Sequence, residues 1–365
     1  MNISLIAGAR PNFMKIAPLV RALEQRGVQP RIVHTGQHYD RQMSETFFQE
    51  LNIPEPDINL EVGSGGAVWQ ITEVMRRLEE DFTDHPPQVV VVVGDVNSTM
   101  AAALTATKLG IPLAHVEAGL RSFDRAMPEE TNRLVTDAVA DWLFTSEPSG
   151  DANLHHEGVP PEKIHLVGNV MIDTLLAHLE RARSENPCAA LGVSPKEFAL
   201  LTLHRPSNVD DPERFESILR AIHKISEQLP VLFPIHPRSR ARIEEFGFID
   251  RSELGGFTTI DPLGYHAMLG LLDAARLVLT DSGGIQEETT VLQVPCLTIR
   301  ENTERPVTVE IGSNQLVGWK TEDILTPAQQ ILAAAPGPRG RVPENWDGRA
   351  AERIAEILLR DLSSG

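Results

Sequence analysis

Short apolar runs alternate along the chain with polar turns and with segments of helical spacing. Residues 88–94 include a continuous valine run, which is typical of a strand buried on both faces of a parallel sheet. By the same pattern we expect strands at residues 3–7, 31–35, 88–94, 113–117, 142–146, 164–167, 198–203, 231–234, 258–260, 277–279, 296–299 and 314–317.

Helices are expected between these strands. Apolar residues at three- and four-residue spacing predict them from the turn after the first strand to residue 25, around residues 132–133, and at 69–78, 100–109, 170–183, 212–228, 285–292 and 349–362. Strands that alternate with helices indicate the α/β class with parallel sheets.

A change of composition divides this pattern in two. Residues 184–195 are polar, and the alternation of strand and helix begins again after them. We therefore expect an N-terminal α/β domain at 1–170, a crossing helix and linker at 171–195, and a second α/β domain at 196–345. The final helix, within 346–365, is expected to pack back on the first domain. Both domains should be wound, Rossmann-like sheets that face each other across a cleft.

Composition and charge narrow the class of protein. The 365 residues are 41% hydrophobic and 23% charged, as in a soluble globular protein with full cores. The net charge of -18 argues against nucleic acid or an anionic membrane as a partner, so an anionic substrate would need a local basic pocket. With only Cys188 and Cys296, neither a disulfide framework nor a cysteine metal cluster is expected.

The chain also lacks two patterns that would direct it to a membrane. The first strand has no basic flank or long apolar core of a signal peptide, and no apolar run approaches the ~20 residues of a membrane span. We therefore expect a cytoplasmic enzyme.

A glycine turn follows the strand at 277–279. The helix that begins after Ser282, Gly283 and Gly284 would point unpaired backbone N–H groups and its positive dipole end at the space above the strand ends. Such a helix terminus favours a phosphate, because the two glycines allow close approach and Ser282 adds a hydroxyl donor. The alternative is a glycine turn before a capped helix that binds nothing.

Charged residues beyond this turn favour a nucleotide. Glu288, one turn into the helix, is placed to accept hydrogen bonds from ribose hydroxyls, and Arg305 supplies a planar cation for a diphosphate. In the N-terminal half, Arg10 and Lys15 lie in the first turns of a helix, where the dipole disfavours cations unless an anion shares the site. The alternative for this pair is an ordinary surface role.

Several acids and histidines follow predicted strands directly. Asp95, Glu117, His204 and His236 lie at strand ends, and Glu129 or Glu130 follows in the next loop. In open parallel sheets the carboxyl edge is where ligands bind. Each residue alone is equally explained as a helix cap or a loop histidine. No metal-ligand spacing, Walker sequence, GxGxxG turn or Gly-x-Ser-x-Gly elbow is present, so we expect neither a metal nor a cofactor.

In combination these motifs resemble the non-hydrolysing UDP-N-acetylglucosamine 2-epimerases, and the resemblance runs nearly from end to end. The residues that carry it are Gly8-Ala-Arg-Pro, Gly36-Gln-His-Tyr-Asp, Gly94-Asp, His115-Val-Glu-Ala-Gly-Leu-Arg, Met127-Pro-Glu-Glu-Thr-Asn-Arg, Gly168-Asn, Leu203-His-Arg, Ile235-His-Pro, Thr280-Asp-Ser-Gly-Gly-Ile-Gln-Glu-Glu and Glu304-Arg-Pro. One departure is that His204 is followed by Arg-Pro-Ser-Asn-Val-Asp, where many members carry an acidic residue two or three places on.

The resemblance implies a glycosyltransferase-B-type fold, a UDP-sugar substrate, interconversion with UDP-N-acetylmannosamine and a homodimer. It places the catalytic acids at Asp95, Glu117 and Glu129 of the first domain, with His204 beside them. The second domain would hold UDP, with Glu288 on the ribose. The diphosphate would lie among Arg10, Ser282, Gly283, Gly284 and Arg305.

Other functions stay open on the sequence alone. A glycosyltransferase would use the same fold with an added acceptor, and a hydrolysing epimerase would release UDP and the free sugar. An epimerase of a modified UDP-hexosamine would share the whole pattern. A nucleotide-sugar sensor without catalysis is disfavoured, because a binding protein does not need several acids at the sugar end.

Overall fold

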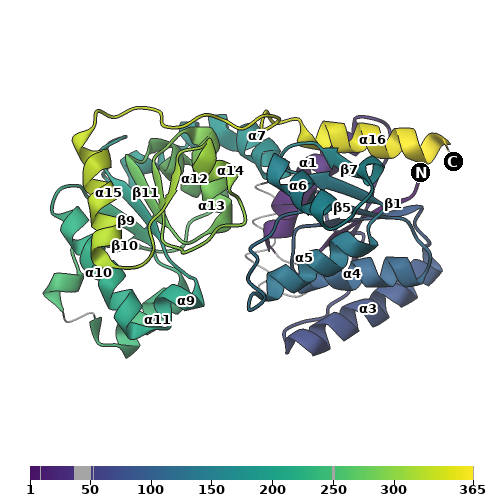
Figure 1. Cartoon of the computed structure of the whole chain (residues 1–365), viewed down its shortest axis with the longest axis horizontal. Coiled ribbons are helices and arrows are strands. Elements are labelled where there is room, and N and C mark those ends of the chain that lie inside the picture. Colours follow the sequence, from purple (N-terminus) through teal and green to yellow (C-terminus); the bar gives the residue numbers. More distant parts are fainter. Residues whose placement is uncertain (9, 37–50, 52, 249–250, 365) are drawn as a thin grey trace. The chain divides into compact units, whose positions relative to one another are not determined.

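The computed structural model describes residues 1–8, 10–36, 51, 53–248 and 251–364, apart from the side chains of residues 10, 11, 253 and 364. The chain forms two compact units. Unit 1 is Met1–Ala177 with Glu344–Gly365, and unit 2 is His178–Pro343. Each unit is a parallel sheet with helices packed on it (Figure 1).

Unit 1 contains a seven-stranded sheet in the order β3-β2-β1-β4-β5-β6-β7. Its strands are β1 (Ile3–Ala7), β2 (Arg31–His34), β3 (Ile58–Asn59), β4 (Val89–Val93), β5 (Leu113–Ala118), β6 (Trp142–Thr145) and β7 (Ile164–Leu166). Neighbouring strands run parallel, and the central strand β4 is fully buried, as the valine run predicts.

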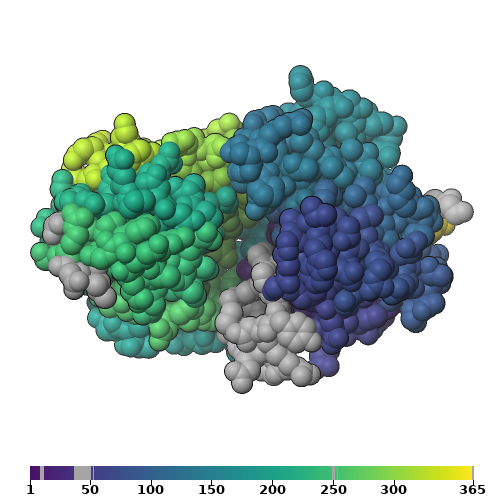
Figure 2. Space-filling view, turned by 90° about the horizontal axis from the view of Figure 1, so that it is seen from below, coloured from purple at the N-terminus to yellow at the C-terminus, as the bar shows by residue number. Residues whose placement is uncertain are grey.

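Helices cover both faces of this sheet. They are α1 (Arg10–Glu24), α3 (Ala67–Asp84), α4 (Asn97–Lys108), α5 (Pro128–Val139), α6 (Pro148–His156), the 3-10 turn η1 (Pro161–Lys163), the first half of α7 (Val170–Ser184) and α16 (Ala350–Ser364). α3 and α4 share a core with one face of the sheet, while α16 lies along α1 (Figure 1). α3 forms the outermost layer of unit 1 in the view of Figure 2, where it is dark blue.

Unit 2 contains a six-stranded sheet in the order β10-β9-β8-β11-β12-β13. Its strands are β8 (Ala199–Thr202), β9 (Val231–Pro234), β10 (Thr258–Ile260), β11 (Leu277–Thr280), β12 (Cys296–Thr298) and β13 (Asn314–Leu316). Its other elements, besides the second half of α7, are α8 (Pro187–Ala190), α9 (Pro206–Val209), α10 (Pro212–Ser226), α11 (Pro237–Glu245), η3 (Ser252–Leu254), α12 (Tyr265–Ala274), α13 (Gly283–Leu292), α14 (Val307–Glu310) and α15 (Thr321–Ala333).

The apolar strands of unit 2 serve two cores at once. Ala199 and Leu201 of β8 pack with residues of α10 and α15, whereas Leu200 between them packs with residues of α12. Leu279 and Val278 of β11 divide in the same way. Because successive side chains point to opposite faces, a strand covered on both sides must be apolar throughout, which is the pattern in the sequence.

The predicted α/β class with two wound parallel sheets is confirmed, and each predicted strand has a counterpart. The short edge strand β3 and the helices α6, α11, α12 and α15 are additions that the sequence pattern did not reveal. None of the described helices is both long and apolar enough to cross a membrane.

The C-terminal helix is attached to unit 1 through a buried acid. Asp173 of α7 accepts hydrogen bonds from the backbone N–H groups of Ala350 (3.1 Å) and Ala351 (2.7 Å), the first residues of α16. Burial raises the pKa of Asp173 to about 6, against the effect of these two hydrogen bonds. The acid therefore satisfies helix N–H groups that would otherwise be buried without an acceptor.

This arrangement predicts different effects for two substitutions of Asp173. Asp173→Ala should destabilise the packing of α16 by about 1–2 kcal/mol, because two buried donors lose their acceptor. Asp173→Asn keeps an acceptor for one of the two N–H groups and carries no buried charge, so it should destabilise the protein less than Asp173→Ala. Hydrogen exchange at the amides of Ala350 and Ala351 measures the effect, and equal protection in the two variants would contradict the assignment.

Candidate active site

The strand order of each sheet marks one place for a ligand. In unit 1, β1 and β4 are neighbours, but the chain continues from β1 towards β2 and from β4 towards β5. In unit 2, β8 and β11 are the corresponding pair. The loops after such a pair separate and leave a crevice at the carboxyl edge of the sheet, and this place is the switch point of the sheet. Most of the predicted site residues follow these four strands.

Glu117 and Lys15 form a buried ion pair at this edge of unit 1. Lys15 Nζ of α1 contacts Glu117 Oε2 at the end of β5. A Cβ atom on Gly94, the residue after β4, would lie 2.6 Å from Lys15 Nζ and 3.5 Å from Glu117 Oε2. Gly94 therefore has to be glycine for the pair to form. The anion that the sequence required near Lys15 is in this structure a carboxylate of the same chain.

The backbone of Glu117 is strained. Its φ is +74°, and the register between β5 and β6 shifts between Val116 and Ala118. A left-handed conformation at a residue with a side chain costs on the order of 1–3 kcal/mol and persists where the surrounding structure imposes it. Bulges of this kind redirect a side chain next to active sites. The strain therefore marks Glu117 as a candidate functional residue independently of any motif.

Asp95 is held by Arg133, the last residue of the motif at 127–133, which is not among the predicted site residues. Arg133 donates from Nε (3.0 Å) and Nη2 (2.9 Å) to Asp95 Oδ2, and from Nη1 to Glu130 Oε2 (2.7 Å). Asn132 Nδ2 donates to the Asp95 carbonyl (2.8 Å). The signal for Arg133 was its position three residues after Glu130, where the two side chains share a helix face.

Glu129 and Glu130 have different surroundings. Glu130 is buried and accepts from Ser122 N, Ser122 Oγ, Phe123 N and Arg133 Nη1 at 2.7–3.0 Å, so its oxygens hold the loop before α5 in place. Glu129 is half-buried in the first turn of α5, and its carboxylate makes no hydrogen bond or ion pair with the described residues. The geometry therefore favours Glu129 as the acid that can meet a ligand.

A buried hydrogen-bond network connects the strand ends that carry Asp95 and Glu117. His115 bonds to Asp137 Oδ1 through Nδ1 (2.6 Å) and to the Gly94 carbonyl through Nε2 (3.0 Å). Asp137 also pairs with Arg121 (2.7 Å). Burial opposes ionisation of Asp137, but His115 and Arg121 outweigh it and lower the pKa of this carboxyl. The network fixes the end of β4 and the end of β5 relative to each other.

In unit 2 the N-terminus of α13 lies directly after β11. Ser282 is its N-cap residue, and no side chain caps the helix there. A Cβ on Gly284 would meet no atom of the described residues within 4 Å, so they leave open space beside this residue of the first turn. A Cβ on Gly283 would lie 2.9 Å from Arg305 Nη1, which places the guanidinium beside the helix terminus. Backbone N–H groups and a cation thus lie next to each other, as an anion site requires.

Arg305 is oriented by acids of the same unit. Its Nε donates to Glu287 Oε1 (2.6 Å), and its Nη1 lies 3.5 Å from Glu304 Oε2. Glu304 in turn forms a bidentate pair with Arg300, with distances of 2.9 and 3.0 Å. Burial opposes ionisation of Glu304, yet Arg300 and Arg305 hold the pKa of this carboxyl far below its usual value. The side chains that orient Arg305 are therefore fixed themselves.

Glu288 is buried on α13, near Glu287. Burial, with a contribution from Glu287, raises the pKa of the Glu288 carboxyl to about 8. No hydrogen bond or ion pair to the described residues compensates for this burial. Hydroxyl donors from a ligand would supply what the carboxylate lacks.

Two histidines meet beside the same helix. His204, after β8, lies with Nδ1 3.0 Å from Oδ1 of the buried Asp281, and its ring centroid is 5.7 Å from that of His236. His236 caps α11 and accepts the Arg238 N–H through Nδ1 (3.1 Å). Burial, with the charges of His204 and Arg238, lowers the pKa of His236. In the sequence, Asp281 stands out only as a member of the motif that begins at Thr280.

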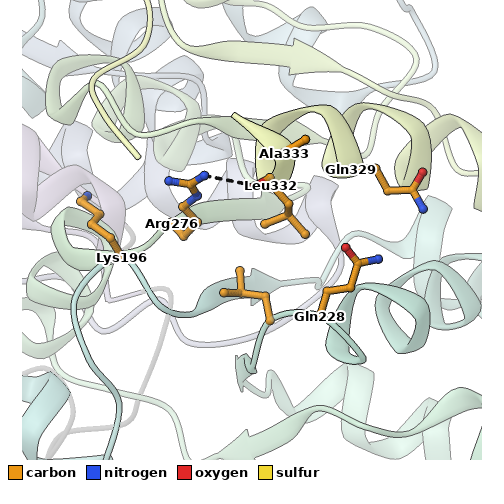
Figure 3. A pocket seen from close by; sticks show the side chains of 7 residues that line it. Lys196, Gln228, Arg276, Gln329, Leu332 and Ala333 are labelled. Carbon is orange, nitrogen blue, oxygen red and sulfur yellow. Dashed lines mark hydrogen bonds between the residues drawn. The ribbon is translucent and has the colours of Figure 1, made fainter. Parts of the chain in front are cut away.

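A hollow of about 470 Å³ lies elsewhere in unit 2 (Figure 3). Lys196 and Arg276, which line it, precede β8 and β11, so the hollow is at the amino edge of the sheet. Arg276 Nη2 donates to the carbonyls of Ile331 (3.2 Å) and Leu332 (3.4 Å) at the end of α15. Lys196 Nζ donates to the carbonyls of Asp273 and Ala275. These cations hold backbone carbonyls, and the switch-point loops remain the better candidate site.

The structure thus brings the predicted residues together in two groups, one per unit. Asp95, Glu117 and Lys15 lie at the carboxyl edge of unit 1, with Glu129 in the helix that also carries Arg133. His204, His236, Glu288, Arg305 and the turn 282–284 lie on unit 2. The side chain of Arg10 and most of the motif 36–40 lie outside the described residues. Within the described part, no cluster of His, Cys, Asp or Glu is arranged to hold a metal.

Fold and site together define an α/β protein of two wound parallel sheets, each with polar residues at its switch point. A solved UDP-GlcNAc 2-epimerase from Methanocaldococcus jannaschii, in complex with UDP-GlcNAc and UDP, has 42% sequence identity and a TM-score of 0.89, and the match covers 99% of this chain and 100% of that one. The enzyme from Neisseria meningitidis bound to UDP-GlcNAc is 28% identical with a TM-score of 0.89, over 99% and 100% of the two chains. The fold is therefore of the glycosyltransferase-B type.

Sequence comparison leads to the family. A curated UDP-2,3-diacetamido-2,3-dideoxy-D-glucuronate 2-epimerase from Pseudomonas aeruginosa is 42% identical over 99% of this chain and 100% of its own length. The family model described as UDP-N-acetylglucosamine 2-epimerase matches residues 21–359. The chain belongs to the UDP-N-acetylglucosamine 2-epimerase family, as the motifs predicted.

Proposed function

We propose that this protein interconverts UDP-N-acetylglucosamine and UDP-N-acetylmannosamine reversibly, by eliminating and re-adding UDP. The observation that carries the proposal is the pairing of two kinds of site within one chain. The switch point of unit 1 holds carboxylates, one of them on a strained backbone, and that of unit 2 holds an open helix N-terminus with an arginine beside it. Family membership supports the choice of UDP-sugar.

Inversion at carbon 2 requires an unusual route. The hydrogen on this carbon lies next to an acetamido group and not to a carbonyl, so direct deprotonation would leave a carbanion without an electron sink. If the bond from carbon 1 to the β-phosphate oxygen breaks with its electron pair going to UDP, positive charge develops on the ring and the hydrogen becomes acidic. A carboxylate takes that proton, and the products are a 1,2-unsaturated sugar (a glycal) and UDP.

The return step completes the epimerisation. A proton is delivered to carbon 2 from the opposite face, and the UDP oxygen re-forms its bond to carbon 1. This sequence needs a base and an acid on opposite faces of the sugar, for which we propose Asp95, Glu117 and Glu129. Arg10, Lys15, Arg305, Ser282 and the N–H groups at Gly283 and Gly284 would retain the diphosphate, with Glu288 on the ribose. His204, assisted by His236, would act at the leaving group.

The relative that acts on a diacetamido uronate favours a second candidate substrate. Its identity to this chain equals that of the M. jannaschii epimerase, 42% in both cases. Both substrates share the carbon 2 chemistry and differ at carbons 3 and 6. Measuring kcat/KM for both UDP-sugars decides between them.

Turnover in deuterium oxide tests the proposed route. With UDP-N-acetylglucosamine as the only sugar, we expect proton NMR to show both epimers with the UDP linkage intact and deuterium at carbon 2 of the product. A product without deuterium at carbon 2 would exclude the exchange of this proton with solvent, and the carboxylate assignment with it. Net release of UDP and free N-acetylmannosamine would indicate a hydrolysing enzyme, and no reaction without an added acceptor would favour a glycosyltransferase.

A further inference from the structure

We infer that Asp281 is the positioning residue for His204: it holds the ring with its proton on Nδ1 and leaves Nε2 to exchange a proton with the leaving diphosphate. The inference rests on the proposed function, because it concerns the step in which the bond to UDP breaks and re-forms. The proposed role of His204 follows from the family pattern, whereas the role of Asp281 follows from the geometry at the β8/β11 switch point.

The donors around Asp281 are distributed unequally over its two oxygens. Oδ2 accepts from Arg205 N (2.9 Å), His204 N (3.1 Å) and Asn208 Nδ2 (3.3 Å). Oδ1 accepts from His204 N (3.2 Å) and faces His204 Nδ1 at 3.0 Å. The side chain of Asp281 is fully buried, whereas that of His204 is 42% exposed. The acid cannot reach a ligand in this arrangement, but the far edge of the imidazole can.

This geometry decides the tautomer of His204. Burial opposes ionisation of Asp281, but the hydrogen bonds from His204 and Arg205 lower the pKa of the carboxyl, so it is an acceptor only. The nitrogen that faces it, Nδ1, must therefore carry a hydrogen. Nε2 is then a lone pair in the neutral ring and an N–H donor in the imidazolium. Protonation at Nε2 breaks no hydrogen bond to the described residues.

His236 has the opposite arrangement. Its Nδ1 accepts the backbone N–H of Arg238, so its hydrogen is on Nε2, and protonation at Nδ1 would break that hydrogen bond. Besides Asp281, the charged groups near these rings are Arg205, which donates from Nε to the Asp281 carbonyl (3.1 Å), and Arg238, which is paired with Asp210. Of the two histidines, His204 is thus the one equipped to give up and regain a proton, and His236 is a neutral donor.

The unequal number of hydrogen-bond donors at the two oxygens of Asp281 also predicts the effect of an amide at position 281. In Asp281→Asn, the single oxygen should take the Oδ2 position, where three donors converge, and the NH2 group should take the Oδ1 position. That NH2 would face His204 Nδ1, so the ring would move its hydrogen to Nε2 and could no longer become an imidazolium without a clash of donors. An Asp-to-Asn change that imposes the wrong histidine tautomer costs serine proteases about 10⁴-fold in kcat.

A double-mutant cycle tests the inference. Asp281→Asn should lower kcat at least about 100-fold, remove the pH dependence that His204 contributes, and leave UDP affinity within about threefold. In a His204→Asn background the same change should alter kcat by less than about threefold, because the ring through which Asp281 acts is gone. Losses that multiply across the two sites would overturn the inference. Asp173→Ala is the matched control: it removes another buried carboxylate that accepts backbone N–H groups, with loss of stability but not of kcat.

A second measurement uses the unmutated protein, in case Asp281→Asn does not fold. In histidine labelled with ¹⁵N on both ring nitrogens, the resonances missing from His204→Asn identify the His204 ring. We expect the hydrogen on Nδ1 of the neutral ring, and a hydrogen on Nε2 would refute the positioning role. If the wild-type protein forms no epimer, the proposed function fails while the tautomer is still measurable, so the two failures are distinguishable.

Discussion

Glu129→Gln should lower the rate of epimerisation at least about 100-fold and leave the folding stability of unit 1 unchanged. Its half-buried carboxylate makes no hydrogen bond or ion pair with the described residues that the amide would lose. Glu130→Gln should have the opposite profile. It replaces a buried acceptor of four hydrogen bonds and leaves Arg133 Nη1 without its carboxylate, which is expected to cost about 3–5 kcal/mol.

Both kcat and a urea unfolding curve are measured for each variant. Glu130→Gln should unfold at clearly lower urea concentration, and any lost rate should follow from a displaced loop before α5. If Glu130→Gln is stable and inactive while Glu129→Gln keeps full activity, the assignment of the two acids must be exchanged. Asp95→Asn and Glu117→Gln are expected to lose at least about 100-fold in rate too, with moderate losses of stability because each removes an ion pair.

Glu288 should make the stability of unit 2 fall as the pH rises. Its pKa is about 8 in the folded protein and 4.5 in the reference state, so the folded protein binds one more proton between these values. The contribution of the neutral carboxyl is therefore fully present below pH 4.5 and is lost progressively up to pH 8. At about 1.4 kcal/mol per pH unit the total loss is several kcal/mol. Glu288→Gln should remove this dependence and be the more stable protein at pH 8.

Nucleotide binding should lower the pKa of the Glu288 carboxyl again if this residue contacts the ribose. Hydroxyl donors favour the ionised form, so UDP should bind with release of close to one proton at pH 7, and more tightly as the pH rises to about 8. Calorimetry in buffers of different ionisation enthalpy measures the proton count. Glu288→Gln should release none. Equal proton release by the wild type and the variant would assign the proton to another group and remove Glu288 from the ribose.

The strands were predictable because burial on both faces leaves a signal in every residue. All five residues of β4 are buried valines, and Leu277, Val278 and Leu279 of β11 supply side chains to two cores. β3 is a two-residue edge strand and leaves no such signal. The missed helices were hidden for different reasons. α11 is mostly charged and α12 is buried on several sides, so neither shows an apolar stripe. α15 has an apolar stripe, but Pro327 in its interior is a helix-breaking signal in the sequence.

For the site, the sequence predicted at which edge of the sheet each residue lies better than it predicted which residues contact each other. Parallel strands have a common carboxyl edge, so residues after them could be assigned to one region without a structure. Contacts between distant residues could not be assigned, and Lys15 and Glu117 are separated by 102 positions. The role of Glu130 depends on backbone N–H groups of a loop, and that of Asp281 on the exact direction of each donor around its carboxylate. Neither leaves a pattern along the chain.

The attachment of α16 to unit 1 has a consequence for the order in which the protein is made. A ribosome synthesises residues 178–343, the whole of unit 2, before it reaches the helix that completes the first unit. Unit 1 therefore stays incomplete while unit 2 is synthesised. During this time the face of α1 that α16 covers is exposed to solvent. At a synthesis rate of roughly 5–20 residues per second this delay lasts several seconds or more, long enough for a chaperone to engage the nascent chain.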